Sequence, residues 1–319
     1  MGVEERTGSA GLVERLLSGD RRALARVISK IEREDEETAG IIAEIYPETG
    51  RALTMGFTGP PGVGKSSIIA KLIELYRQEE KRVGVVSVDP SSPFSKGAIL
   101  GDRIRLSDHF LDPGVFIRSM GSRGHLGGLA GGSRLAGVAM EAGGCDVVIY
   151  ETVGVGQGEV EVASAADTVV LALQPGAGDS VQALKAGVME IADIFCINKA
   201  DNPQAKNAAS EVRSILEIGH ELDPDPWSPP IVMTRGDTGE GVQELKETIA
   251  QHRRFLEEDD RLGRRRRAAL RDFVISWATN RLENEMHERL HREYTELVEK
   301  VYNRELDPIS ASDLIFKEV

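Results

Sequence analysis

The sequence GPPGVGKS, at residues 59–66, gives the strongest indication of how this chain folds. It matches the pattern G-x-x-x-x-G-K-[ST] and lies between an apolar run and a segment with helical spacing, the context that a phosphate-binding P-loop requires. Glycines let the backbone N–H groups of such a loop turn toward phosphate oxygens, and the N-terminus of the next helix adds partial positive charge. An ordinary Gly-rich turn, the alternative, does not require this placement.

The P-loop pattern also predicts roles for single residues. We expect the Lys65 ammonium to contact the β- and γ-phosphates of a nucleotide, and the Ser66 hydroxyl to bind Mg²⁺. The predicted phosphate-binding residues are Gly59, Pro60, Pro61, Gly62, Val63, Gly64, Lys65, Ser66 and Ser67.

Short apolar runs alternate with Gly-rich loops and helical stretches from residue 52 onward. This alternation predicts a mainly parallel sheet covered by helices on both faces, with ligands bound at the carboxyl ends of the strands. We therefore predict an α/β fold with a P-loop NTPase domain over residues 51–252. The predicted strands are the runs at 52–58, 83–88, 115–119, 146–151, 168–173, 193–198 and 230–233.

Helical patterns flank this domain. Residues 10–46 carry apolar side chains at helical spacing, which predicts an N-terminal helical extension over 1–50. A highly charged pattern after residue 252 predicts a C-terminal helical arm over 253–319, in which the run Arg264–Arg267 is interpreted as a solvated helix face. The apolar stripe of this arm could contact a second copy or pack on the chain's own domain. It consists of Phe273, Trp277, Leu282, Met286, Leu290, Tyr294, Leu297 and Val301.

Composition excludes several classes of protein. The formal net charge of −13 argues against binding to duplex nucleic acid. No apolar stretch approaches the roughly 20 residues that span a bilayer, and the first residues lack the regions of a signal peptide. Cys145 and Cys196 lie inside apolar runs, as core residues do in a reducing compartment. We expect a soluble, cytoplasmic protein without a nucleic-acid or membrane partner.

A second motif, Asn198-Lys199-Ala200-Asp201, follows the apolar run that ends at Ile197. The Asp201 carboxylate could accept hydrogen bonds from N1–H and the 2-amino group of guanine, two donors that adenine does not present on that edge. Adenine would leave this acceptor unpaired, which supplies discrimination between the bases. The Lys199 stem could lie along the plane of the base. A solvated loop is the alternative, but behind a strand in a P-loop chain we interpret the motif as a guanine reader.

Acidic residues after other runs could serve a metal ion. Glu151 and Gly154 occupy the acidic and glycine positions of the Asp-x-x-Gly that many GTPases have at a strand end, and the longer Glu151 indicates a subfamily. A capped strand end is the alternative. Asp89 and Asp102 could hold Mg²⁺ or its waters or orient the attacking water, or could be turn or N-cap residues. The predicted catalytic residues are Lys65, Asp89 and Glu151, and the predicted metal ligands are Ser66, Asp89, Asp102 and Glu151.

These residues together resemble those of the MeaB/ArgK family of P-loop GTPases, which includes the human methylmalonic aciduria type A protein. The resemblance covers almost the whole chain. Its most particular stretches are VDPSSPFSKGAILGDRIRL (88–106), RSMGSRGHLGGL (118–129), YETVGVGQGE (150–159) and QPGAGDSVQALKAG (174–187).

The resemblance implies a GTPase that binds GTP and GDP with Mg²⁺. It also implies a chaperone of an adenosylcobalamin-dependent mutase, usually methylmalonyl-CoA mutase, that gates cofactor loading and protects the mutase from inactivation. By the same resemblance, residues 89–103 and 154–162 correspond to switches I and II, and residues 175–187 to an additional switch that signals to the mutase. The C-terminal helices resemble a homodimerisation arm. Isobutyryl-CoA and ethylmalonyl-CoA mutases stay open as partners.

Two stretches depart from the expected patterns. Many GTPases place Ser-Ala after the last strand to support the base, whereas this chain has Met233-Thr234-Arg235. The stretch Pro93-Phe94-Ser95-Lys96 also differs from the Thr- and Gly-rich version typical of the family.

Two other functions are alternatives. A metal-insertion GTPase would need a clustered His/Cys tract, and the 6 scattered histidines and 2 cysteines argue against it. A transport-system kinase, which the ArgK name suggests, would usually prefer ATP, and Asp201 points the other way.

Overall fold

The computed structural model describes residues 4–33, 35–89, 106–121, 128–152, 165–176, 189–222, 227–290 and 295–318. The chain forms two compact units, Met1–Leu270 and Arg271–Val319. The predicted boundary between residues 252 and 253 falls inside helix α10 (Val242–Glu257) of the first unit.

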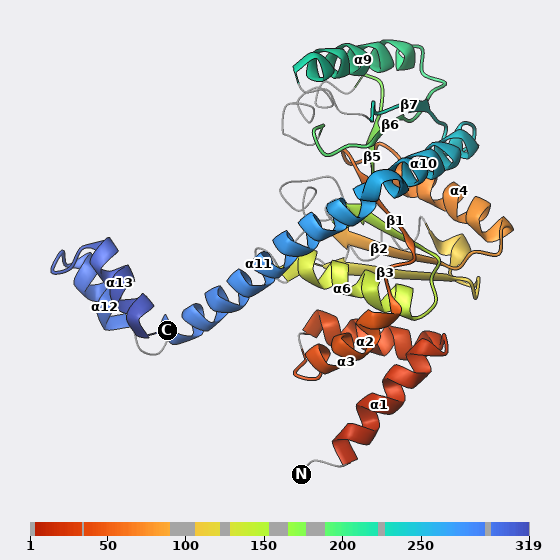
Figure 1. The fold of residues 1–319 in the computed structure, drawn as a ribbon. Coiled ribbons are helices and arrows are strands. Elements are labelled where there is room, and N and C mark those ends of the chain that lie inside the picture. The colour runs from red at the N-terminus through yellow and green to blue at the C-terminus, as the bar shows by residue number, and fades with distance from the viewer. Residues whose placement is uncertain are drawn as a thin grey trace. The chain divides into compact units, whose positions relative to one another are not determined.

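A parallel sheet of seven strands forms the centre of the first unit, in the order β3-β2-β4-β1-β5-β6-β7 (Figure 1). Each predicted run overlaps one strand, with β2, β3 and β4 extending one or two residues past their runs, so the α/β prediction is confirmed. The chain leaves β1 toward β2 and β3 on one side and later crosses to β5, β6 and β7 on the other. The carboxyl end of β1 therefore lies at a switch point, where α/β sheets bind ligands. The strands are β1 (Leu53–Thr58), β2 (Val83–Asp89), β3 (Val115–Gly121), β4 (Val147–Thr152), β5 (Thr168–Leu173), β6 (Ile194–Ile197) and β7 (Ile231–Met233).

Helices cover both faces of the sheet because successive strand residues point to opposite sides. On one face, Ile194 and Cys196 of β6 share a core with α4 (Lys65–Gln78) and α10. On the other face, Phe195 and Ile197 pack in a second cluster with residues of α9 (Ala205–Leu222). Helix α6 (Gly128–Ala142) contacts β2, β3 and β4.

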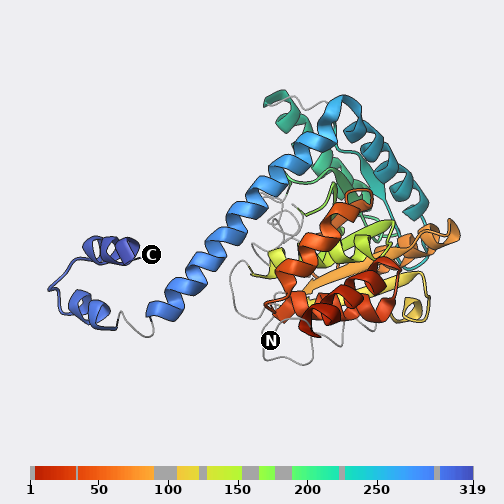
Figure 2. The same cartoon turned by 60° about the horizontal axis from the view of Figure 1, so that its bottom comes forward.

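Three N-terminal helices extend the layer of α6. They are α1 (Glu4–Leu17), α2 (Arg21–Arg33) and α3 (Thr38–Ile45), followed by the short η1 (Tyr46–Glu48). Helices α2 and α3 both contact α6, and Figures 1 and 2 show them on the side of α6 away from the sheet. The apolar face of α2 is buried there, including Leu24 and Ile28. Each such side chain contributes about 1.5–3 kcal/mol by its burial, which holds this segment to α6.

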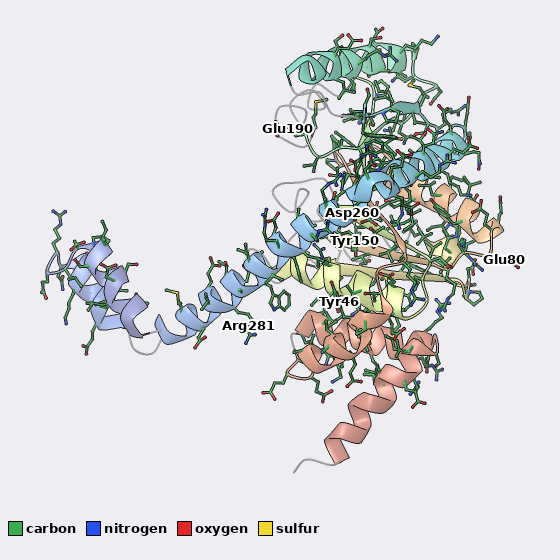
Figure 3. All side chains as sticks on the ribbon, in the orientation of Figure 1. Tyr46, Glu80, Tyr150, Glu190, Asp260 and Arg281 are labelled. Atoms are coloured by element: carbon green, nitrogen blue, oxygen red, sulfur yellow. The ribbon has the colours of Figure 1, made fainter. Side chains whose placement is uncertain are left out.

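Tyr150 shows how closely α6 packs on the sheet. It extends from β4, is fully buried, and is labelled in Figure 3. A Cβ atom placed on Gly137 of α6 would lie 1.9 Å from its hydroxyl oxygen, so this position of the helix accepts only glycine. Burial raises the pKa of Tyr150 well above its ordinary value.

Helix α11 (Arg261–Leu290) begins in the first unit and follows η3 (Glu258–Asp260). Arg265 donates to both carboxylate oxygens of Asp193 at 2.8 and 2.7 Å, and Arg266 donates to both of Asp167 at 2.9 and 2.6 Å. These aspartates stand just before β6 and β5, at the amino edge of the sheet. The interpretation of Arg264–Arg267 as a solvated helix face is therefore wrong for its two middle residues.

The second unit holds the rest of α11 with α12 (Thr295–Tyr302) and α13 (Pro308–Glu318), and the last two helices contact each other. Phe273 and Trp277 of α11 have their ring centroids 5.8 Å apart. In the part of the chain that the structure describes, no helix is both long enough and apolar enough to cross a membrane.

Candidate nucleotide-binding site

The P-loop connects β1 to α4 at the carboxyl edge of the sheet, and its glycines are required by close backbone approaches. Gly59 has a φ of 133°, and a Cβ atom on it would lie 2.1 Å from the carbonyl oxygen of Ala172 in β5. Gly64 has a φ of 97°, and its Cβ would lie 2.3 Å from Asn198 Nδ2. The loop therefore passes directly over β5 and against the second motif, in a conformation that side chains would block.

Lys65 is the first residue of α4, and its side chain folds back across the loop. Its Nζ donates to the carbonyl oxygens of Gly59 at 2.5 Å and Pro60 at 3.1 Å, and the residue is buried. A buried ammonium needs such partners to offset its desolvation. These contacts keep the positive charge at the loop and the helix N-terminus, where anions bind most readily.

A buried carboxylate lies beside the loop. The Ser66 hydroxyl donates to Glu151 Oε1 at 2.5 Å, and the Ser87 hydroxyl donates to Oε2 at 3.3 Å. The sheet register explains this meeting, because Glu151 of β4 stands between Phe57 of β1 and Ser87 of β2. Two residues predicted as metal ligands, 85 positions apart, are thus in direct contact.

The oxygen atoms of this cluster fit a magnesium ion. Mg²⁺ prefers hydroxyl, carboxylate, phosphate and water oxygens, and proteins usually give it only one or two ligands of their own. Among the described residues, no three His, Cys, Asp or Glu side chains gather into a metal cage. Asp89 ends β2 at the same edge, with its side chain outside the described part. Asp102 and Gly154 also lie outside the described residues.

Asn198 joins three parts of the site. Its Nδ2 donates to the Val63 carbonyl oxygen at 2.7 Å, inside the P-loop. Its Oδ1 accepts from the backbone N–H of Gly236 at 2.9 Å and from the Thr234 hydroxyl at 3.2 Å, both after β7. The side chain is buried, so these bonds hold together the P-loop, the second motif and the loop after β7, residues 234–241, which we call the β7 loop.

Lys199 and Asp201 occupy the outer part of the motif. Lys199 has a φ of 58° and donates from Nζ to the Gly62 carbonyl oxygen at 3.1 Å and to Gln174 Oε1. Its stem therefore lies along the rim of the P-loop. The Asp201 side chain is 59% exposed and so accessible to a ligand, and its Oδ1 lies 3.5 Å from Arg235 Nε.

Sequence reasoning missed several partners in this site. Ser87 and Gly236 belong to no motif, and Gln174 was noted only as the first residue of the stretch 174–187. The sheet order brings all three beside residues of the site. One signal was available: all three lie near the carboxyl end of a predicted strand.

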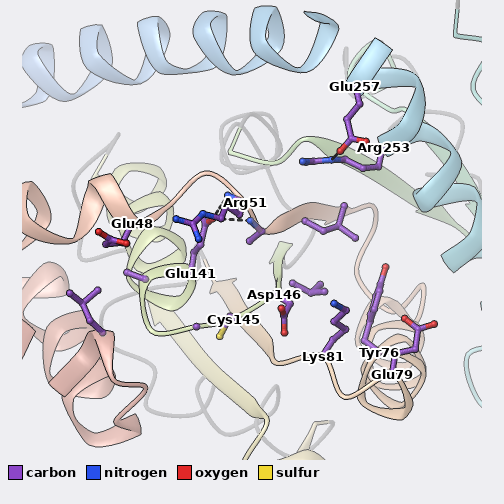
Figure 4. Close-up of a pocket in the computed structure, with 16 residues that line it drawn as sticks. Glu48, Arg51, Tyr76, Glu79, Lys81, Glu141, Cys145, Asp146, Arg253 and Glu257 are labelled. Carbon is purple, nitrogen blue, oxygen red and sulfur yellow. Dashed lines mark hydrogen bonds and ion pairs between the residues drawn. The ribbon is translucent and has the colours of Figure 1, made fainter. Parts of the chain in front are cut away.

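A sizeable cavity lies elsewhere in the first unit. It measures about 610 Å³ and is lined by Arg51, Glu141, Cys145 and Asp146, near the amino ends of β1 and β4 (Figure 4). The Glu141 carboxylate accepts from the backbone N–H of Arg51 and of Ala52, and Asp146 accepts from that of Arg82 at 2.8 Å. No predicted nucleotide-site residue lines this cavity.

The family model described as Methylmalonyl Co-A mutase-associated GTPase MeaB matches residues 21–291. The chain belongs to this family. A relative from Pyrococcus horikoshii, named as a GTPase, is 47% identical over 97% of each chain. The methylmalonic aciduria type A homolog of Mus musculus is 31% identical, over 95% of this chain and 77% of its own. A solved structure of a LAO/AO transport system kinase is 28% identical, with a TM-score of 0.72 over 98% of this chain and 97% of its own.

These comparisons confirm the resemblance on which the sequence interpretation rested. The MeaB family and its relatives are named as GTPases, so this chain is a GTPase and binds guanine nucleotides.

Proposed function

We propose that this GTPase is a chaperone of an adenosylcobalamin-dependent acyl-CoA mutase, with methylmalonyl-CoA mutase as its partner. In this proposal it gates cofactor loading, protects the mutase from inactivation, and works in the cytoplasm. One observation carries the proposal: 271 of the chain's residues, 21–291, match a family whose description names that mutase. The likeness to the mouse homolog named for methylmalonic aciduria supports it.

We propose that the nucleotide binds at the carboxyl edge of the sheet. The phosphates would contact residues 59–67 and Gly154, and the base would contact Asn198, Lys199 and Asp201. The buried Lys65 ammonium and the N-terminus of α4 would neutralise phosphate charge, which is the main task of a protein in phosphoryl transfer. The exposed carboxylate of Asp201 and the fixed amide of Asn198 support this placement of guanine.

We assign Mg²⁺ to Ser66 and Glu151, with Asp89 and Asp102 as further candidates. A bound Mg²⁺ would neutralise developing charge on the phosphate oxygens. The Ser66 hydroxyl donates its hydrogen bond to Glu151, so a lone pair on its oxygen stays available for a cation. Glu151 would thus orient the metal-binding hydroxyl of Ser66 as well as add negative charge. Its long side chain reaches both Ser66 and Ser87.

We also propose that the second unit mediates homodimerisation. Apolar side chains are well exposed there, among them Val274 at 61% and Ile275 at 59%. An apolar surface of this kind commonly marks a protein interface. The proposed switches, 89–103, 154–162 and 175–187, fall mostly outside the described residues, and their roles rest on the family resemblance.

Affinity for the mutase in each nucleotide state tests this function. Binding of the purified GTPase to the same organism's methylmalonyl-CoA mutase is measured with GDP and with a non-hydrolysable GTP analogue. We expect tight binding whose strength differs between the two nucleotides, because coupling between nucleotide and partner is reciprocal. Absence of binding in both states would contradict the proposal, and the isobutyryl-CoA and ethylmalonyl-CoA enzymes would serve as comparison partners.

The name of the LAO/AO structure favours one second candidate, a kinase of a transport system. The fate of the γ-phosphate distinguishes the two functions. A GTPase releases it as inorganic phosphate, whereas a kinase transfers it to an acceptor. We expect radioactive γ-phosphate to appear only as inorganic phosphate.

A further inference from the structure

Arg235 lies between the proposed guanine-reading motif, Asn198–Asp201, and the acidic residues Asp237 and Glu240 of its own loop. It follows β7 and has a side chain that is 30% exposed. Its guanidinium faces three carboxylates: Asp201 with Nε at 3.5 Å, Asp237 with Nη2 at 3.3 Å, and Glu240 with Nη1 at 3.7 Å. The two outer carboxylates engage the Nη atoms, so the Nε edge is the one turned toward Asp201.

The backbone of the β7 loop fixes where this arginine stands. The Arg235 N–H donates to the Glu240 carbonyl oxygen at 2.9 Å, and the Gly239 N–H donates to the Arg235 carbonyl oxygen at 2.7 Å. The Ala200 N–H donates to the Thr234 carbonyl oxygen at 3.0 Å, which ties the Asp201 segment to the same loop. The backbone segments that carry Arg235 and Asp201 are therefore tied to each other.

The neighbouring Thr234 cannot contact Asp201 through its side chain. It is fully buried, and its hydroxyl is turned inward between Asn198 and Cys196. Many GTPases have a serine after the last strand to support the base, and this chain has none there. In the described part of the β7 loop, Arg235 is the residue whose side chain pairs with Asp201.

We propose that Arg235 is a positioning residue that holds the Asp201 carboxylate for guanine and thereby sets selectivity for that base. This inference rests on the proposed role of Asp201 as the guanine reader. An exposed aspartate samples several rotamers, but two hydrogen bonds to N1–H and the 2-amino group require one orientation of the carboxylate. The contact at 3.5 Å is an ion pair and not a hydrogen bond, so it orients the carboxylate while leaving acceptor sites on its oxygens for the base.

The ratio of dissociation constants for inosine diphosphate and GDP tests this role, because hypoxanthine lacks only the 2-amino group. We expect Arg235→Ala to lower this ratio about twofold to fivefold, the range of a partly exposed charged contact. Arg235→Lys should give an intermediate ratio, since an ammonium keeps the charge but loses the planar fork. Arg77→Ala is the matched control: it removes an arginine of similar exposure, paired with Asp112 at 2.9 Å, and should leave the ratio unchanged.

The variant Asp201→Asn tests the proposed guanine site independently of the role of Arg235. This variant alone should lose the preference for GDP and gain affinity for xanthosine diphosphate, because an amide can donate to the 2-oxo group. Arg235→Ala should then have little further effect in the Asp201→Asn background. An unchanged GDP preference in Asp201→Asn would overturn the proposed guanine site. If Asp201→Asn loses the preference for GDP as expected, the guanine site stands. An unchanged ratio of dissociation constants in Arg235→Ala, or additive effects in the double variant, would then overturn only the role of Arg235.

Discussion

Glu151 is the residue on which our proposal for the phosphate end of the site rests most directly. It is buried at 4% exposure, and the carboxylate is held by the hydroxyls of Ser66 and Ser87. A buried carboxylate with a perturbed environment beside a P-loop is typical of a functional site, which is why we propose that it serves a bound cation. It replaces the shorter aspartate that many GTPases have at this position.

Glu151→Gln should preserve the fold and impair magnesium-dependent hydrolysis. The amide oxygen can still accept from Ser66, but the negative charge is lost. We expect the rate of GTP hydrolysis at limiting Mg²⁺ to fall about 10- to 100-fold, the usual effect of removing a group that orients a metal ligand. The measurement is phosphate release against Mg²⁺ concentration. Glu79→Gln, at a carboxylate that is 55% exposed, is the control, and equal curves for the two variants would contradict the assignment.

The two cysteines should be inert in the native protein. Burial raises the pKa of the Cys145 thiol to about 11 and that of Cys196 to about 12, against an ordinary value of 9.0. Reaction needs the thiolate, so a thiol reagent at pH 8 should label neither residue until the chain unfolds. Because the native state holds these protons more tightly, their stabilising contribution is complete below pH 9 and is lost as the pH rises toward 12. Rapid labelling of the folded protein at pH 8 would contradict this.

At the scale of elements, the start of α11 is attached to the strands that carry the site. Asp193 and Asp167 precede β6 and β5, whose carboxyl ends lead to Asn198 and Gln174. Asp193 also accepts from the Val169 N–H at 2.8 Å and lies 3.4 Å from His252 Nε2. The amino edge of the sheet thus holds a charged network that fixes the first turns of the helix.

Neighbouring arginines in one helix supply matched variants for this network. Arg265→Ala and Arg266→Ala should each lower the free energy of unfolding by about 1–3 kcal/mol, because each leaves a largely buried aspartate short of a charged partner. Arg264→Ala, at the exposed position just before them, should stay within about 0.5 kcal/mol of the parent. Denaturant unfolding gives these values, and equal stability of the three variants would contradict the network.

The same elements show what could be predicted from sequence. Seven apolar runs indicated seven strands because strand periodicity is local, and the P-loop pattern fixed the location of Lys65 and Ser66. The pairing of Arg265 with Asp193 spans 72 positions, so the local charge pattern of the helix could not reveal it. Ser87 was missed for the same reason. Its role depends on the β2–β4 register rather than on its neighbours in the sequence.

At the scale of the whole molecule, the first unit separates two edges of one sheet. The carboxyl edge gathers the P-loop, Glu151 and Asn198, whereas the amino edge holds the large cavity and the arginine network. Nucleotide binding at the carboxyl edge should therefore stabilise the core that both edges share.

Thermal unfolding with and without nucleotide tests whether nucleotide binding stabilises the core. GDP at 100 times its dissociation constant should add about 2.7 kcal/mol to the free energy of unfolding, and ADP at the same concentration should add far less. Lys65→Ala should lose most of the response to GDP while remaining folded. A full GDP response in that variant would sink the assignment of the phosphate site.

Mutase-coupled GTP hydrolysis is the most direct measure of the central claim. The rate of phosphate release is recorded for the purified chain alone and with methylmalonyl-CoA mutase from the same organism, with GTP or ATP as substrate and with Lys65→Ala as the blank. We predict hydrolysis that is specific for GTP, changed by the mutase, and absent in the variant. GTP hydrolysis that the mutase leaves unchanged at saturating concentration would contradict a function as its chaperone.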